Sequence, residues 1–295
     1  MEWTEREVQL PARPAALAGT LLLPDSAAHA PGVVILGDAG PVDRDGNLPG
    51  LDNDSLLHLA RDLAGCGIAS VRPDRRGIGF SAAAGPDEDA LTIESYAADA
   101  AGWVGFLRAQ PQIGVVSLIG HGVGGLVASL AAERGPLHRL VLLEAPGRPF
   151  GAILRARLAE LGLAPVLRRR AEATLAALEQ GRTVDDPPAG LASLFRPGAQ
   201  PYLISVLRLD PAAVLARSTM PALVIQGTAD LEANAADADR LAASRAGVAR
   251  LTVPGMSHVL RIALPDRAAN MRLYQERAVP LAAGLAARIC TFIGR

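Results

Sequence analysis

The sequence predicts an α/β fold with a mostly parallel central sheet and helices on both of its faces. Short apolar runs bounded by glycine or proline alternate with longer stretches of helical periodicity, as in repeated β-α-β units. The apolar runs are continuous, which is typical of strands buried on both faces. The chain has 295 residues, half of them hydrophobic, so it can form one large α/β domain or a domain that carries an insertion.

The predicted elements follow one another in a regular order. Two extended segments open the chain, VQLPA and ALAGTLLLP. Strands are expected at 32–37, 68–73, 114–120, 140–145, 222–227 and 249–255, and those at 32–37 and 222–227 are expected to be buried. Helical periodicity separates them, and Asp52 or Asn53 is available as the N-cap of the first helix. The last helix is expected in VPLAAGLAARICTFI.

The stretch 147–219 differs from this alternation. It is Arg-rich, shows helical spacing without a strong strand, and is broken by DDPPAG and RPGAQP. It falls between two predicted strands, where a lid would cover their carboxyl ends. We therefore expect a core domain of residues 1–146 and 220–295 with a helical cap insertion at 147–219. The alternative is one more pair of surface helices.

The net charge and the cysteine content indicate which partners, compartments and cofactors the protein is expected to lack. The formal net charge is −1, which predicts neither nucleic acid nor an anionic membrane as a partner. The first residues lack the basic start and apolar stretch of a signal peptide, so a cytoplasmic location is expected. Cys66 and Cys290 are the only cysteines, and we expect two buried packing residues rather than a disulfide. No cluster has metal-ligand spacing, so no metal or cofactor is predicted.

The stretch LIGHGVGGLV, residues 118–127, fits two motifs. Gly120, Gly122 and Gly125 satisfy the dinucleotide fingerprint G-x-G-x-x-G, and Glu144 follows at about the distance of a ribose-binding acid. The nucleophile elbow G-x-S-x-G also fits, with glycine in place of serine. The dinucleotide motif usually opens the first β-α-β unit, whereas this stretch follows several strands, and it leaves QGTAD and GMSH unexplained.

The elbow predicts an acid and then a histidine further along the chain. Asp230 ends ALVIQGTAD, after a buried strand, and His258 follows LTVPGMS. Each residue alone is weak evidence, because a strand-end Asp is often a helix cap and a loop His is often a surface residue. In this order, after a strand–turn–helix, the two predict a histidine general base held by an aspartate.

With these motifs the sequence resembles the α/β-hydrolase superfamily over nearly its whole length. It is most similar to a bacterial esterase-like group with the phrase GPVDRDGN at 40–47. Other matching phrases are DRRGIGFS (74–81), RPGAQPYLISVLRLDPAA (196–213), QGTADL (226–231) and MSHVL (256–260). The resemblance implies the α/β-hydrolase fold with a helical cap.

The resemblance also implies site roles. Asp230 matches the triad acid, His258 matches the triad base, and the backbone N–H groups of Ala39 and Val123 match the oxyanion hole. Two positions depart from the pattern. Gly122 replaces the nucleophilic serine, and Asp38 stands where the group usually has a small residue, often glycine.

Gly122 fits the positive φ of an elbow, but it has no hydroxyl to form an acyl-enzyme. A His–Asp dyad, an oxyanion hole and a vacancy that a water could fill would remain. We therefore predict an enzyme acting on a carbonyl-containing small molecule (ester, lactone or ketone) through His258 as general base, with Asp38 as a further candidate. The reaction would be that of a lyase, cyclase or isomerase, or direct hydrolysis.

Two alternatives stay open. One is a serine carboxylesterase inactivated by replacement of its elbow serine with Gly122. The other is a non-catalytic small-molecule binding protein. The apolar helices of the predicted cap favour a hydrophobic substrate of medium size, and a homodimer is left open.

Overall fold

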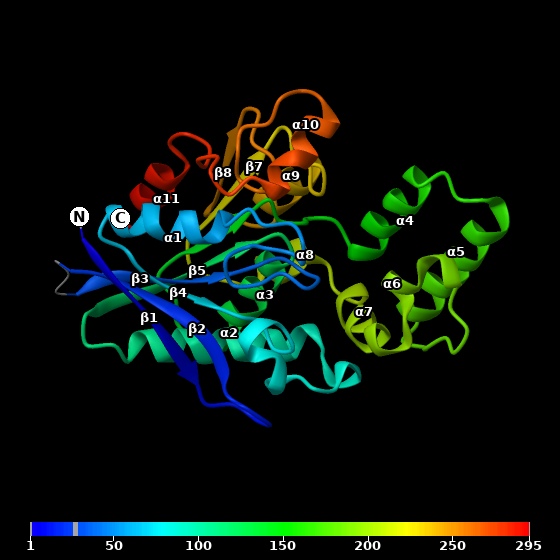
Figure 1. The fold of residues 1–295 in the computed structure, drawn as a ribbon, viewed down its shortest axis with the longest axis horizontal. Coiled ribbons are helices and arrows are strands. Elements are labelled where there is room, and N and C mark those ends of the chain that lie inside the picture. Colours follow the sequence, from blue (N-terminus) through cyan, green and yellow to red (C-terminus); the bar gives the residue numbers. More distant parts are fainter. Residues whose placement is uncertain (1, 26–28, 295) are drawn as a thin grey trace.

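The computed structural model describes residues 2–25 and 29–294. In these residues one eight-stranded sheet has the order β1-β2-β4-β3-β5-β6-β7-β8 (Figure 1). The pairs β1–β2 and β2–β4 are antiparallel, and the other pairs are parallel. The strands are β1 (Trp3–Leu10), β2 (Leu17–Pro24), β3 (Ala30–Leu36), β4 (Ala69–Pro73), β5 (Ile113–His121), β6 (Leu140–Leu143), β7 (Ala222–Gly227) and β8 (Val248–Val253). The predicted α/β class is confirmed, and every predicted strand overlaps an observed one.

Helices cover both faces of the sheet. On one face α1 (Ser55–Gly65) and α11 (Leu285–Ile293) pack over apolar side chains of the strands. On the other face lie α2 (Ile93–Arg108), α3 (Gly124–Ala131), α8 (Pro211–Ala216) and α9 (Ala235–Ala242). Each fully buried leucine or isoleucine of these layers contributes about 1.5–3 kcal/mol relative to an exposed one. The continuous apolar runs of the sequence are therefore the strands that both layers bury.

Helix starts follow the local sequence. The helix α2 begins after a capping box between Thr92 and Ser95. The N-cap of α1 is Asp54, not Asp52 or Asn53 as predicted, although the Asn53 side chain accepts a hydrogen bond from the Ser55 N–H. The two predicted caps therefore lie two residues and one residue too early. Six short 3₁₀ helices link the longer elements in the described residues: Gly79–Ala84, Glu88–Ala90, Ala132–Arg134, Ala189–Leu191, Pro197–Ala199 and Leu273–Gln275.

The segment between β6 and β7 is helical. It contains α4 (Phe150–Glu160), α5 (Pro165–Glu179), α6 (Ala192–Phe195) and α7 (Gln200–Leu207), which share a hydrophobic cluster of their own. Figure 1 shows these helices grouped to one side of the sheet. The helix α8 lies inside the predicted insertion at 147–219 but packs on α3. The segment therefore has its own core and rejoins the sheet layers at α8.

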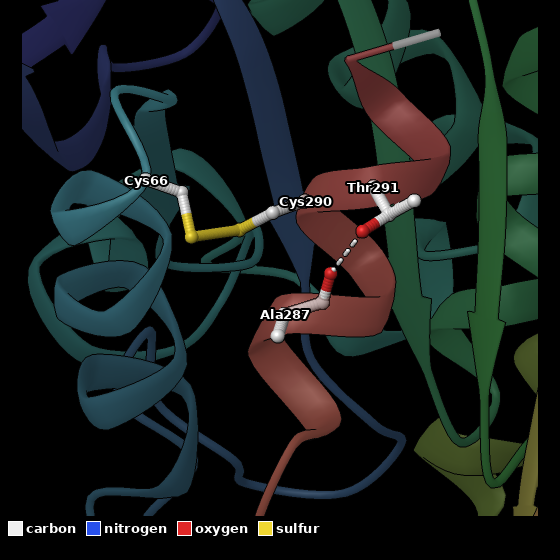
Figure 2. The surroundings of a disulfide bond; sticks show 4 residues. All are labelled: Cys66, Ala287, Cys290 and Thr291. Atoms are coloured by element: carbon white, nitrogen blue, oxygen red, sulfur yellow. Dashed lines mark hydrogen bonds between the residues drawn. A yellow bond between two sulfur atoms is a disulfide. The ribbon is translucent and has the colours of Figure 1, made fainter.

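Cys66, just after α1, and Cys290, in α11, form a disulfide with their Cα atoms 6.3 Å apart (Figure 2). The prediction of two separate buried packing residues was wrong, because Cys66 is exposed and Cys290 is half-buried. The two cysteines are 224 residues apart in the sequence, and only the packing of α1 beside α11 brings them together. The disulfide links the first helix of the chain to the last.

None of the described helices combines the length and the apolarity needed to cross a bilayer. The most apolar stretch of the sequence, near 114–132, forms β5 and then α3, as expected.

Candidate functional site

A sharp turn joins β5 to α3. Gly122 lies at its centre with φ +54°, a conformation that glycine adopts without a steric penalty. Gly124 lies against the carbonyl group of Gly37, where a Cβ atom would not fit. This close approach brings the loop after β3 next to the start of α3. The predicted strand–turn–helix geometry of the elbow is therefore present around Gly122.

Asp38, two residues after β3, fills the space that a side chain at position 122 would need. A Cβ atom built on Gly122 would lie under 3.0 Å from Cγ and both carboxylate oxygens of Asp38. The sequence predicted a vacancy here that a water could fill, and that prediction was wrong. The backbone around Asp38 explains the difference, because it turns the short side chain toward the elbow, where hydrogen-bond donors hold the carboxylate.

Two backbone N–H groups hold the Asp38 carboxylate. The N–H groups of Ala39 and Val123 donate to Asp38 Oδ1 over 2.7 and 2.6 Å. These are the two groups that the sequence assigned to an oxyanion hole, and the fold does bring them together. Hydrogen bonds to a carboxylate at these distances are short and strong. In this structure the N–H pair therefore binds the protein's own carboxylate.

His258 connects Asp38 with Asp230. Its Nε2 atom lies 3.1 Å from Asp38 Oδ2, and its Nδ1 atom lies 3.1 and 3.2 Å from the two oxygens of Asp230. Asp230 lies in the loop after β7, His258 lies in the loop after β8, and both side chains are buried. All three residues were predicted for the site from the sequence. We call this arrangement the Asp38–His258–Asp230 relay.

The pKa values of the relay favour an ion pair. Burial alone raises the pKa of Asp38, but the hydrogen bond and positive charge of His258 outweigh it and hold that pKa well below its ordinary value. Burial alone lowers the pKa of His258, but the charges of Asp230 and Glu232 and the hydrogen bonds raise it well above its ordinary value. Both directions favour the charged forms, a carboxylate at Asp38 beside an imidazolium at His258.

His121 supports His258 from the strand side. Its Nε2 atom lies 2.8 Å from the His258 backbone oxygen, and the two ring centroids are 4.5 Å apart. Burial and the nearby charge of His258 lower the pKa of His121, which favours its neutral form. A neutral ring here adds no second positive charge next to the relay.

Glu144 lies behind Asp230 and is fully buried. Its Oε1 atom accepts a hydrogen bond from the Gly227 N–H over 2.8 Å. Burial, and then the charge of Asp230, raise the pKa of Glu144 well above its ordinary value. The dinucleotide alternative needs Glu144 exposed to a ribose hydroxyl, so its burial argues against that alternative. Sequence position suggested an acid here but not its burial against β7.

Glu232 belongs to the site and was missed by the sequence analysis. Its Oε1 atom lies 3.8 Å from His258 Nε2 and accepts a hydrogen bond from the Tyr274 hydroxyl over 3.1 Å. Arg157 of α4 donates to its other oxygen over 3.3 Å. The only signal in the sequence is its place two residues after Asp230, in the same loop.

A cavity of about 240 Å³ opens above the relay. Its floor contains Asp38, Gly122 and His258, and Phe150 and Ile153 of α4 form part of its wall. The remaining lining residues are Ala39, Gly40, Val123, Glu144, Pro146, Arg157, Glu232 and Ala233. Because α4 contributes apolar side chains and the floor is charged, the cavity suits a small molecule with a polar group at one end.

Three side chains on the cavity floor could hold a metal ion. Asp38, Glu232 and His258 each offer one ligand atom, and these atoms all lie within 4.8 Å of one another. The three residues belong to three separate loops, after β3, β7 and β8. Sequence spacing could not indicate this cluster, because the parallel sheet alone brings these loops to one edge.

The ion pair predicts that the pKa of His258 differs between the unaltered chain and Asp38→Asn. In Asp38→Asn the imidazole of His258 loses one anionic partner, so its pKa is expected to fall toward its ordinary value of 6.5. NMR titration of the His258 Hε1 resonance measures this change. The exposed Asp186→Asn is the matched control and is expected to leave that pKa unchanged. An unchanged His258 pKa in Asp38→Asn would contradict the ion pair.

The raised pKa of His258 and the lowered pKa of Asp38 also determine how the stability of the fold changes with pH. The raised pKa of His258 stabilises the fold below pH 6.5, and this contribution is lost as pH rises through the folded-state pKa. The lowered pKa of Asp38 stabilises the fold above pH 3.8, and this contribution is lost as pH falls through its folded-state value. Both contributions are fully present between pH 3.8 and pH 6.5. The difference in the free energy of unfolding between the unaltered chain and Asp38→Asn should therefore be largest in this range, and urea unfolding of both proteins at several pH values measures it.

Known proteins share this fold and part of this sequence. Residues 48–270 match the model of a family described as "Alpha/beta hydrolase family". The chain is 28% identical to "Esterase EstD" from Thermotoga maritima over 225 residues, which are 75% of this chain and 52% of that protein. The chain therefore spans about half the length of the curated relative that it matches.

Solved structures agree at the level of the fold. A structure described as the DcsB complex with its substrate analogue has a TM-score of 0.65, at 15% identity and 99% coverage of both chains. Est1E from Butyrivibrio proteoclasticus with bound ferulic acid has a TM-score of 0.62, at 15% identity, covering 97% of this chain and 96% of that one. The family model covers most of the sequence, and the observed sheet and turn agree with it. The chain therefore belongs to the alpha/beta hydrolase family.

Proposed function

We propose that this protein is an enzyme that acts on a carbonyl-containing small molecule, an ester, lactone or ketone, without a serine nucleophile. One observation carries the proposal. The Asp38 carboxylate lies in the place of the nucleophile's side chain and is bonded to both N–H groups and to His258. The relay then transfers protons in place of a serine triad.

The same observation argues against an esterase that lost its serine by a single replacement. A serine at position 122 would overlap the Asp38 carboxylate, so a working serine and the present Asp38 position exclude each other. Restoring the serine hydroxyl would require Asp38 to leave the N–H pair. The present position of the Asp38 carboxylate therefore requires a glycine at position 122.

Burial of the relay argues against a protein that only binds a ligand. Asp230 and His258 are buried, and taking charged groups out of water costs several kcal/mol per ion before pairing offsets it. Binding a hydrophobic molecule needs no such group on the cavity floor. Proton transfer does need it, which supports catalysis.

The resting charges suggest the order of proton transfers. In ester hydrolysis a water adds to the carbonyl carbon and gives one proton to the Asp38 carboxylate, while the imidazolium of His258 donates its Nε2 proton to the carbonyl oxygen. As the bond to the alcohol oxygen breaks, the neutral ring takes the hydroxyl proton back, Asp38 returns its proton to the leaving oxygen, and Asp230 keeps the ring oriented. Because Asp38 fills the N–H pair, Ala39 and Val123 can stabilise a substrate oxyanion only after Asp38 leaves.

Turnover of a panel of small esters, lactones and ketones tests the proposal. Asp38→Asn and His258→Gln are each expected to lower turnover by about 10²–10⁴-fold, the usual contribution of general acid–base catalysis. His138→Gln is the control, because His138 precedes β6 at the strand end opposite Glu144. Full turnover in His258→Gln would refute the relay, and binding of these compounds without any turnover would favour the binding protein.

The name of the matched relative indicates which substrates to assay first. The matched relative from Thermotoga maritima is named an esterase, so short-chain esters are the first compounds to assay. Phe150 and Ile153 in the cavity wall support the expected hydrophobic substrate. The expected cytoplasmic location, the absence of nucleic-acid and membrane partners, and a homodimer remain predictions for fractionation and for mass measurement in solution.

A further inference from the structure

We infer that Asp38, Glu232 and His258 form a binding site for one divalent transition-metal ion on the cavity floor. The inference deepens the proposed function, on which the catalytic role of the ion rests. In the ion-bound chain His258 Nε2 is a ligand, so the ion takes the place of the imidazolium as the group that polarises the carbonyl group. Two of the ligand-atom distances are 3.1 Å, from His258 Nε2 to Asp38 Oδ2, and 3.8 Å, from His258 Nε2 to Glu232 Oε1. All three ligand atoms lie within 4.8 Å of one another. Ligands about 2.0–2.2 Å from one ion lie roughly 3–3.5 Å apart, so Asp38 and His258 already have the spacing of two ligands, and the Glu232 carboxylate must move closer to complete the site.

Each of the three side chains is oriented by a second group. The N–H groups of Ala39 and Val123 hold Asp38 Oδ1, which leaves Oδ2 directed at His258. The Asp230 carboxylate binds His258 Nδ1, and this leaves Nε2 for a ligand bond. A histidine that ligates a metal almost always has such a partner on its other nitrogen.

Glu232 is oriented in the same way. The Tyr274 hydroxyl and Arg157 bind its two oxygens, and its backbone N–H donates to Asp230 over 2.7 Å. The loop that carries Glu232 is thus fixed to the residue that orients His258. Preorganised outer contacts of this kind distinguish the site from acidic side chains that happen to be neighbours.

The charges around His258 also favour a cation. Three carboxylates, those of Asp38, Asp230 and Glu232, lie within 4.0 Å of its ring nitrogens, and among the described residues Arg157 is bonded to one of them. A divalent ion with a neutral His258 balances these charges. The donor set of two carboxylates and one imidazole, without a thiolate, suits Zn²⁺, Mn²⁺, Fe²⁺ or Co²⁺ rather than Cu⁺.

The site lies where the proposed reaction lacks an electrophile. Asp38 occupies the N–H pair that would otherwise polarise a carbonyl group, whereas an ion between Asp38, Glu232 and His258 faces the 240 Å³ cavity. Such an ion would polarise a substrate carbonyl group and make a bound water acidic enough to give its proton to solvent, which would supply the nucleophile that the missing serine does not.

Metal titration of the full chain tests the inference. After treatment with a chelator and buffer exchange, ZnCl₂ is titrated by calorimetry, and CoCl₂ is followed by its visible absorption. One saturable site per chain is expected, and Asp38→Asn, Glu232→Gln and His258→Gln should each weaken binding by at least about 100-fold. Asp230→Asn should weaken it by about 10–100-fold through the orientation of His258. Asp186→Asn and Glu179→Gln, which lie outside the cavity, should bind as the unaltered chain does.

The outcomes separate this inference from the proposed function. Absence of a saturable site for either ion, or equal affinity in Glu232→Gln and the unaltered chain, overturns the metal site. Glu232 is half-buried, so this variant is expected to fold, and thermal unfolding checks that it does. If the chelated chain turns over substrate at full rate while His258→Gln does not, the relay stands and the catalytic role of the ion is wrong.

Discussion

Gly122→Ser alone is expected to hydrolyse p-nitrophenyl acetate no faster than the unaltered chain, whereas Asp38→Gly combined with Gly122→Ser is expected to exceed the single variant by about 10³-fold or more. In the single variant the new Cβ atom overlaps the Asp38 carboxylate, and φ of +54° strains the serine by about 1–3 kcal/mol. In the double variant the N–H pair is free, and His258 and Asp230 can activate the serine. A colorimetric assay of the purified variants measures the difference.

Two further variants make this result interpretable. Asp38→Gly alone lacks both the serine hydroxyl and the Asp38 carboxylate of the relay, so it should not exceed the unaltered chain. Asp38→Asn with Gly122→Ser keeps the bulk of the side chain while removing its charge, so it should also remain inactive if space is the obstacle. Strong esterase activity in Gly122→Ser alone would show that Asp38 moves aside easily, and it would favour the inactivated carboxylesterase.

Loss of the disulfide is expected to lower the free energy of unfolding by about 3–5 kcal/mol, because the bond closes a loop of more than two hundred residues in the unfolded chain. Urea unfolding of Cys66→Ser with Cys290→Ser measures the loss. A reductant should lower the midpoint of the unaltered chain and leave that of the double variant unchanged. Equal midpoints for the oxidised chain and the variant would mean that the bond adds no stability.

The disulfide also bears on the expected cytoplasmic location. Disulfides persist in oxidising compartments and are rare where glutathione keeps thiols reduced. Alkylation of the protein in cell extracts, with and without prior reduction, would show whether Cys66 and Cys290 are bonded in the cell. Free thiols would agree with the cytoplasm, and a bonded pair would favour another compartment.

The fold was predictable because its signals are local. The apolar runs of the inner parallel strands, β3 to β7, reflect burial of these strands on both faces of the sheet, whereas β8 is an edge strand without a buried residue. The positions of Asp230 and His258 were also predictable, because each follows a strand and the two come in the chain order of the family. Parallel strands then bring their carboxyl-end loops to one edge.

The other parts of the site depend on contacts between distant segments. The direction of the Asp38 side chain depends on the missing Cβ of Gly122, a residue 84 positions further along the chain. Glu232 enters the site through the conformation of the loop after β7, and the burial of Glu144 follows from the pairing of β6 with β7. The pairing of Cys66 with Cys290 likewise depends on which helices share a face of the sheet.

The fit between Asp38 and Gly122 constrains how such a protein can evolve. Starting from a serine ancestor, an aspartate at 38 gained first would have been excluded from its present position, whereas a glycine at 122 gained first would have removed the nucleophile. The first order places an aspartate that cannot yet take its position, and the second loses the old chemistry before the new arrangement is complete. The same barrier stands in the reverse direction, so descendants of this protein should keep both residues or lose both together.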